Sequence, residues 1–209
     1  MQNKNKKNGG YTLIETMIAV ALFIIVVTAG MGALLNANLL YNKSKDMRSI
    51  LDSLSFAMDD MSRNLRTGYN YYCIAGSSNS SYASMPLTAL SPSTLTPLSL
   101  SGQNCWGIAF KPSGPSSVPQ WAYEIVTPNS GNPYLIKTTD GGNTWAQLTP
   151  IEVAINTTSS YFSIFGAEPP FGDYQQPFVN IHLVGTILYK TITTSFSLQT
   201  SVSQRQIDI

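Results

Sequence analysis

The longest hydrophobic run in the chain lies near its start. The 23 residues from Leu13 to Leu35 contain a single charged side chain, that of Glu15. Because a helix rises about 1.5 Å per residue, this run can cross a hydrocarbon core of about 30 Å. Lysines precede the run, so the positive-inside bias predicts a cytoplasmic N-terminus and an extracytoplasmic chain beyond about Tyr41. The pattern predicts one membrane-spanning helix.

After this run the hydrophobic residues recur at steps of three and four, which predicts an amphipathic continuation of the same helix. We expect the helix to end near Thr67 and Gly68, with the glycine in the left-handed cap conformation. The predicted apolar stripe consists of Met47, Ile50, Leu51, Leu54, Met58, Met61 and Leu65. The predicted polar side carries Lys45, Arg48, Asp52, Asp59, Asp60, Arg63 and Arg66.

Beyond residue 68 the pattern changes to short strand-like runs bounded by turn residues. Two stretches, 76–104 and 111–119, are rich in Ser, Pro or Gly and predict irregular surface. The runs predict an antiparallel sheet, and an alternating closing strand with Ile192, Phe196, Leu198 and Val202 on its buried face. The predicted strands are 105–111, 121–127, 134–138, 144–148, 161–165, 178–184 and 190–202.

These elements predict an α+β fold, in which a long N-terminal helix packs on an antiparallel β-sheet head. The membrane half of the helix comes first and the amphipathic half follows. The expected organisation is a lysine-bearing segment at 1–10, a transmembrane helix at 11–40, an amphipathic helix at 41–67 and a β-rich globular head at 68–209.

The charge balance argues against a nucleic-acid partner. The chain has 12 Lys and Arg residues against 11 Asp and Glu residues, and charged residues make up 11% of it. Loss of the three lysines before Gly10 would leave 9 basic residues against 11 acids. The sequence of the expected head shows no cluster of lysines and arginines of the kind that neutralises phosphates.

The residues just before the hydrophobic run form a specific motif. A lysine-bearing segment ends in Gly9-Gly10, and Tyr11-Thr12-Leu13-Ile14-Glu15 follows. This stretch resembles the start of type IV prepilins, a family that includes the pseudopilins of type II secretion. The resemblance implies that prepilin peptidase cuts between Gly10 and Tyr11 and methylates the new amino group of Tyr11. It also implies that Glu15 pairs with the amino group of a neighbouring subunit during assembly.

Two other interpretations of the N-terminus remain open. An ordinary cleaved signal peptide fits poorly, because its apolar stretch is shorter and its cleavage site follows that stretch. An uncleaved signal anchor explains the length and topology equally well, but it does not explain Glu15. An acid costs on the order of 2.5 to 3.5 kcal/mol at mid-bilayer and less near the interface, so it normally has a partner.

Parts of the head resemble the larger minor pilins and J-type pseudopilins. This resemblance rests on residues 61–66, 134–145, 176–179 and 199–205. It implies a minor structural subunit that starts in the inner membrane and then joins a pilus or pseudopilus. Its implied partners are prepilin peptidase, other pilin or pseudopilin subunits, the inner-membrane assembly platform and membrane lipid. A filament-tip or membrane-anchored binding module, acting through the loop at 76–104, is the alternative.

Cys73 and Cys105 both lie beyond the membrane segment, in a compartment where a disulfide can form. We expect them to pair, because metal ligation would need further ligands and His182 is the only histidine in the chain. A calcium site through Asp173 in the loop 168–173 is conceivable, but calcium prefers six to eight oxygen ligands. No metal or cofactor is therefore expected.

One local segment, Thr138 to Trp145, resembles the Asp-box hairpin of sialidase-type propellers. Such boxes repeat once per blade, whereas this chain has one copy. We therefore interpret Asp140 as the centre of a structural turn, with glycan or calcium contact as the alternative. No nucleophile elbow, phosphate loop or zinc spacing is present, and His182 is expected to be structural. The chain is not expected to be an enzyme.

Overall fold

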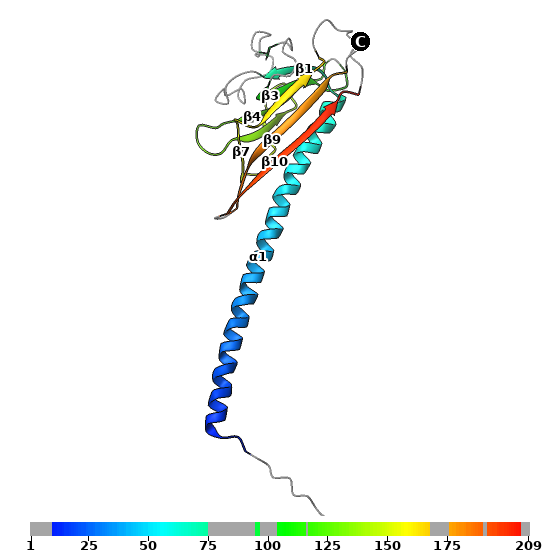
Figure 1. Cartoon of the computed structure of the whole chain (residues 1–209). Coiled ribbons are helices and arrows are strands. Elements are labelled where there is room, and N and C mark those ends of the chain that lie inside the picture. The colour runs from blue at the N-terminus through cyan, green and yellow to red at the C-terminus, as the bar shows by residue number, and fades with distance from the viewer. Residues whose placement is uncertain are drawn as a thin grey trace, which may run out of the picture. The chain divides into compact units, whose positions relative to one another are not determined.

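The computed structural model describes residues 10–74, 95–96, 104–115, 117–167, 176–189 and 192–205. Residues 1–47 form one compact unit and residues 48–209 form a second. Figure 1 shows the elements in chain order, with the long helix first and the strands after it. The predicted α+β class, with a long N-terminal helix followed by antiparallel sheets, is confirmed.

The helix α1 runs from Leu13 to Thr67. It is the one helix of the described chain that is long and apolar enough to cross a membrane, and none of its most apolar segment is buried. The predicted stripe in its second half is also confirmed, because Ile50, Leu54, Met58, Met61 and Leu65 are buried together with Ala57. Leu51 is 40% exposed, since it lies beside the stripe rather than on it.

The helix ends at Thr67, as predicted, but Gly68 does not adopt the left-handed cap conformation. The glycine is needed there for space. A Cβ atom at Gly68 would overlap Cδ2 of Phe110, so any larger residue would displace this buried ring. The left-handed residue is instead Asn70, with φ of 52°, where the register of the first strand shifts.

The first sheet has six strands in the order β2-β1-β3-β4-β5-β6, and all its pairings are antiparallel. Its strands are β1 (Tyr69–Ile74), β2 (Leu95–Thr96), β3 (Gly107–Lys111), β4 (Trp121–Val126), β5 (Tyr134–Thr138) and β6 (Ala146–Gln147). The pairing of Ile108 with Tyr123, and of Tyr123 with Lys137, places these three residues on one face.

The second sheet is built around a long hairpin. Strands β9 (Phe178–Tyr189) and β10 (Ile192–Ser203) pair residue by residue over their whole length, without a bulge. The other side of β9 pairs with β7 (Val153–Ile155) and β8 (Tyr161–Phe165). In β10, Phe196 and Val202 are buried and Leu198 is half-buried, as the alternation predicts.

Several strand predictions are wrong in detail. The strands β1 and β7 were not predicted, and β2 lies inside the stretch interpreted as irregular surface. The strand expected at 144–148 is reduced to two residues, whereas β9 continues five residues past the expected end at Val184. The missed strands are short or bulged, so they show little alternation.

A polar cluster joins the end of α1 to the first sheet. The carboxylate of Asp60 accepts hydrogen bonds from Lys137 at 2.8 and 3.0 Å and from the Tyr123 hydroxyl at 2.9 Å. The Lys137 ammonium group also lies 5.2 Å from the centre of the Trp121 ring. Burial raises the pKa of the Tyr123 phenol well above its usual range, so Tyr123 stays a hydrogen-bond donor.

Candidate processing and assembly site

The residues around the predicted cleavage point precede the helix. Gly10, Tyr11 and Thr12 lie outside the helix, which begins at Leu13. Tyr11 is 82% exposed, and a Cβ atom built on Gly10 would have no neighbour within 4 Å among the residues that the structure describes. The bond between Gly10 and Tyr11 therefore lies in non-helical, accessible backbone, which suits a protease groove. Residues 1–9 of the leader lie outside the described residues.

Glu15 lies in the first turn of α1. The Thr12 carbonyl accepts hydrogen bonds from the backbone N–H groups of Glu15 and Thr16, at 3.1 and 3.2 Å, and these bonds start the helix. Glu15 is exposed, and within the described part of the chain its carboxylate has no ion-pair partner. A negative charge in the first turn interacts favourably with the helix dipole and stabilises the helix. This is the ordinary structural role for an acid at this position.

The carboxylate of Glu15 is set in a surface that is otherwise apolar. Large hydrophobic side chains with more than half of their surface exposed surround it and continue along the helix. Within its own compact unit these side chains have no protein core to cover them. An exposed apolar surface of this size is stable when lipid or other helices cover it. The first members of this surface are Tyr11, Leu13, Ile14, Met17, Ile18, Val20, Leu22 and Phe23.

A model of a known protein family matches this region. The model of the prokaryotic N-terminal methylation motif matches residues 5–31, which include Gly10, Tyr11 and Glu15. The chain carries the hallmark of type IV prepilin-like proteins. No curated protein and no solved structure matches the chain significantly. The prepilin-like motif implies processing by prepilin peptidase and assembly with other pilins, and its family is a structural one rather than an enzyme class.

The head contains the expected disulfide between Cys73 and Cys105, with Cα atoms 5.5 Å apart. Cys73 lies in β1, and Cys105 bridges to Phe162 of β8 through two backbone hydrogen bonds of 2.7 and 2.9 Å. The disulfide therefore joins β1 of the first sheet to the point where the second sheet meets it. We expect this cross-link to stabilise the head, because it restricts the unfolded chain.

The Asp-box-like segment forms a hydrogen-bonded turn. Asp140 accepts hydrogen bonds from the hydroxyls of Thr138 and Thr144 and from the Thr144 backbone N–H, at 2.6 to 2.9 Å. The bonds from Thr144 are the main reason that the pKa of Asp140 falls to about 2. Gly141 and Gly142 have φ of 78° and 88°, which favour glycine. These contacts explain why the turn has Asp, Thr and Gly at these positions, and they support the interpretation of Asp140 as the centre of a structural turn.

The remaining candidates lie elsewhere in the head. His182 is half-buried in β9, where its Nδ1 atom lies 2.9 Å from the Ser159 carbonyl and its ring lies 5.1 Å from that of Tyr161. These contacts support a structural role. The loop 168–173 with Asp173 lies outside the described residues, and the residues that are described contain no cluster of metal-ligating side chains.

The structure brings together basic residues that the sequence interpretation did not combine. Arg63 and Arg66 lie near the end of α1, and the backbone N–H of Arg205 donates a 2.8 Å hydrogen bond to the Arg66 carbonyl. The spacing of Arg63 and Arg66 was visible in the sequence as one helix face. Arg205 could not have been added to them, because only the pairing of β10 with β9 brings the end of the chain back to the helix.

Proposed function

We propose that this protein is a structural subunit of a type IV pilus or type II secretion pseudopilus, processed after Gly10 and assembled through α1. The observation that carries this proposal is the methylation motif at residues 5–31, which runs directly into an exposed apolar helix. A soluble enzyme would have no use for either feature. An uncleaved anchor would use the helix but would not need the motif.

In the proposed sequence of events, the leader stays on the cytoplasmic side and the head lies outside the cytoplasm. The prepilin peptidase hydrolyses the bond between Gly10 and Tyr11, and the new amino group of Tyr11 is methylated. The helix is first surrounded by inner-membrane lipid and later by the helices of other subunits. The leader at 1–10, the assembly helix at 11–40, the amphipathic helix at 41–67 and the head at 68–209 are the proposed functional parts.

Glu15 has a specific role in this proposal. A carboxylate in an apolar surface is costly unless an opposite charge compensates it. The α-amino group at Tyr11 of a neighbouring subunit is a cation that exists only after cleavage. Pairing the two would link processing to assembly, because an uncleaved neighbour offers no amino group at that position.

We further propose that the subunit is a minor one, similar to J-type pseudopilins, which works with other pilin or pseudopilin subunits and the inner-membrane assembly platform. The support comes from the resemblance of four head segments. They correspond to the last turns of α1, the β5–β6 hairpin, the start of β9 and the end of β10. The segment 76–104, on which the alternative of a tip-located binding module depends, lies largely outside the described residues.

The substitution Glu15→Gln tests the proposed assembly role. It removes the charge with little change in shape, so we expect normal membrane insertion and cleavage but about tenfold less subunit in sheared filaments. The measurement is the ratio of sheared to membrane-bound subunit in cells that express the matching pilus or pseudopilus machinery.

The matched control is Asp52→Asn, which removes an exposed carboxylate from the same helix outside the apolar surface. This variant should assemble like the unsubstituted protein. Normal filament incorporation of the Glu15→Gln variant would contradict the pairing role.

A further inference from the structure

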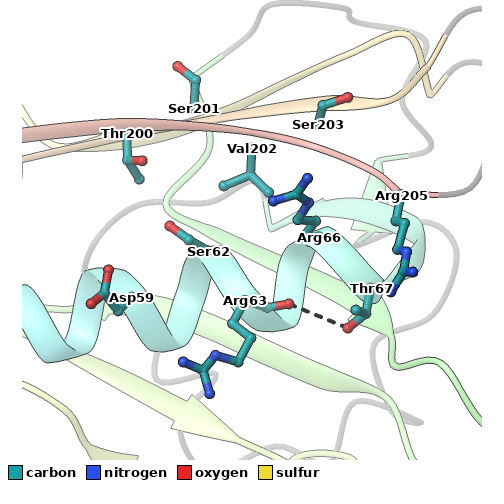
Figure 2. Close-up of a pocket in the computed structure, with 10 residues that line it drawn as sticks. All are labelled: Asp59, Ser62, Arg63, Arg66, Thr67, Thr200, Ser201, Val202, Ser203 and Arg205. Atoms are coloured by element: carbon teal, nitrogen blue, oxygen red, sulfur yellow. Dashed lines mark hydrogen bonds between the residues drawn. The ribbon is translucent and has the colours of Figure 1, made fainter.

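A groove of about 880 Å³ lies between the last turns of α1 and the end of β10. Figure 2 shows its residues, with Thr200 and Val202 pointing toward the helix and Ser201 and Ser203 pointing away from it. All of the groove lies within the second compact unit. Its lining residues are Asp59, Ser62, Arg63, Arg66, Thr67, Thr200, Ser201, Val202, Ser203 and Arg205.

The groove follows the free edge of a strand. Four consecutive residues of β10 line it, although neighbouring side chains of a strand point to opposite faces. Residues from both faces can line one groove only if the groove runs along the edge between the faces. The strand order agrees with this position of the groove, because β10 is the outermost strand of the second sheet and pairs with β9 alone.

The outer side of this edge has no strand partner among the described residues. Among the described residues, every backbone hydrogen bond of β10 within the sheet goes to β9, and none reaches its outer side. Proteins usually guard exposed edges with charged residues, prolines or bulges. The described strand runs over 12 residues, from Ile192 to Ser203, with no charged residue, no proline and no bulge. An edge of this kind is a template for one further strand.

The same groove is positively charged. It contains Arg63, Arg66 and Arg205 against one acid, Asp59, and the three arginines are exposed. No ion pair joins any of them to another residue in the described part of the chain. The hydrogen bond from Arg205 N–H to the Arg66 carbonyl fixes the end of β10 beside the helix, which keeps these arginines together.

We propose that this groove binds an extended acidic segment of a partner protein, which adds to the second sheet as a strand beside β10. The strand edge supplies backbone hydrogen bonds, and the arginines select carboxylates, to which the guanidinium group binds with two parallel hydrogen bonds. Charge complementarity favours an acidic partner over a second copy of β10, whose described residues carry no charge. The proposal concerns the head alone and does not depend on cleavage or on Glu15.

A designed peptide provides the test. The probe is a fluorescent peptide of about ten residues with alternating glutamate and threonine, so that a strand places every carboxylate on one face. Binding to the full chain in detergent is measured by fluorescence anisotropy, and hydrogen exchange of β10 is measured with and without peptide. We expect saturable binding, slower exchange in β10 and about tenfold weaker binding to the double variant Arg66→Glu/Arg205→Glu.

The matched control is Arg48→Glu, which reverses an exposed arginine of the same helix outside the groove, and which should bind like the unsubstituted protein. All variants are compared by thermal unfolding, so that loss of binding is not confused with loss of fold. A second probe replaces two central threonines with proline, which removes backbone donors, and it should bind much more weakly.

Three results would overturn the proposal. Equal binding of the proline-containing and unsubstituted peptides would indicate a purely ionic patch without strand addition. Equal binding to the groove variants and to the Arg48→Glu variant would place the peptide elsewhere. Slower exchange in β10 that depends on protein concentration and not on peptide would indicate pairing between two copies. Each of these results leaves the proposed pilin function unaffected.

Discussion

Glu124 is the most unusual residue of the head. It is 3% exposed on β4, and its Oε2 atom has no hydrogen-bond partner among the described residues. It alternates with Tyr123, which faces Asp60 of the helix, so Glu124 lies on the opposite face with Ala122. Burial raises the pKa of Glu124 to about 8, so this carboxyl is protonated at neutral pH in the folded protein.

This burial predicts a pH-dependent stability. Because the pKa is higher in the folded than in the unfolded chain, the folded state binds the extra proton between about pH 4.5 and 8. The contribution of Glu124 is fully present below this window and is lost as the pH rises through it, by on the order of 1 kcal/mol per pH unit. Unfolding in denaturant at pH 5, 7 and 9 measures the loss.

Glu124→Gln should remove most of this dependence, since the amide does not titrate. The control Glu152→Gln changes a half-buried acid of the same head and should keep the pH profile of the unsubstituted protein. A Glu124→Gln variant whose stability falls with pH as steeply as that of the unsubstituted chain would show that Glu124 is ionised when folded.

At the scale of elements, the cluster around Asp60 holds α1 against the first sheet. The side chains of Asp60 and Lys137 are 23% and 17% exposed, so each charge relies on the other for compensation more than the charges of a fully exposed pair do. Asp60→Asn leaves Lys137 half-buried without its counter-charge. We expect this change to lower the free energy of unfolding by about 1 to 3 kcal/mol, measured with denaturant.

The neighbouring Asp59 provides the comparison for this prediction. It is exposed, and Asp59→Asn should change the free energy of unfolding by less than about 0.5 kcal/mol. Equal effects of the two substitutions would mean that the Asp60 cluster does not hold the helix to the sheet.

The sequence predicted α1 and most strands because each has a regular hydrophobic period. The stripe from Ile50 to Leu65 repeats over several turns, and β10 alternates along its length. Strand β1 could not be predicted in this way, because the left-handed Asn70 shifts its register and interrupts the alternation. The role of Gly68 was also hidden, since it depends on contact with Phe110, which lies far along the chain.

The N-terminal motif was visible in the sequence because its residues are neighbours in the chain. Gly10, Tyr11 and Glu15 lie within six consecutive residues, so spacing alone was enough to single them out. No comparable spacing in the sequence marked the groove between α1 and β10. Arg63 and Arg66 meet Arg205 only after the β9–β10 hairpin returns the chain to the helix, and this return depends on tertiary packing.

At the scale of the whole molecule, one continuous helix serves two different environments. Its first part exposes a hydrophobic surface that only lipid or other helices can cover, and its last part buries six residues in the head. A helix built in this way fits the proposed subunit, whose first part would be covered by lipid or by other helices. In the proposed function, N-terminal processing moves the chain from the membrane to the assembly.

The most direct test is the intact mass and the N-terminal residue of the protein, taken from cells with and without the matching prepilin peptidase. We expect a chain that starts at Tyr11 and carries one methyl group when the peptidase is present, and a chain with residues 1–10 still attached when it is absent. A chain that keeps residues 1–10 in the presence of an active peptidase would contradict the account and would leave a signal-anchored head.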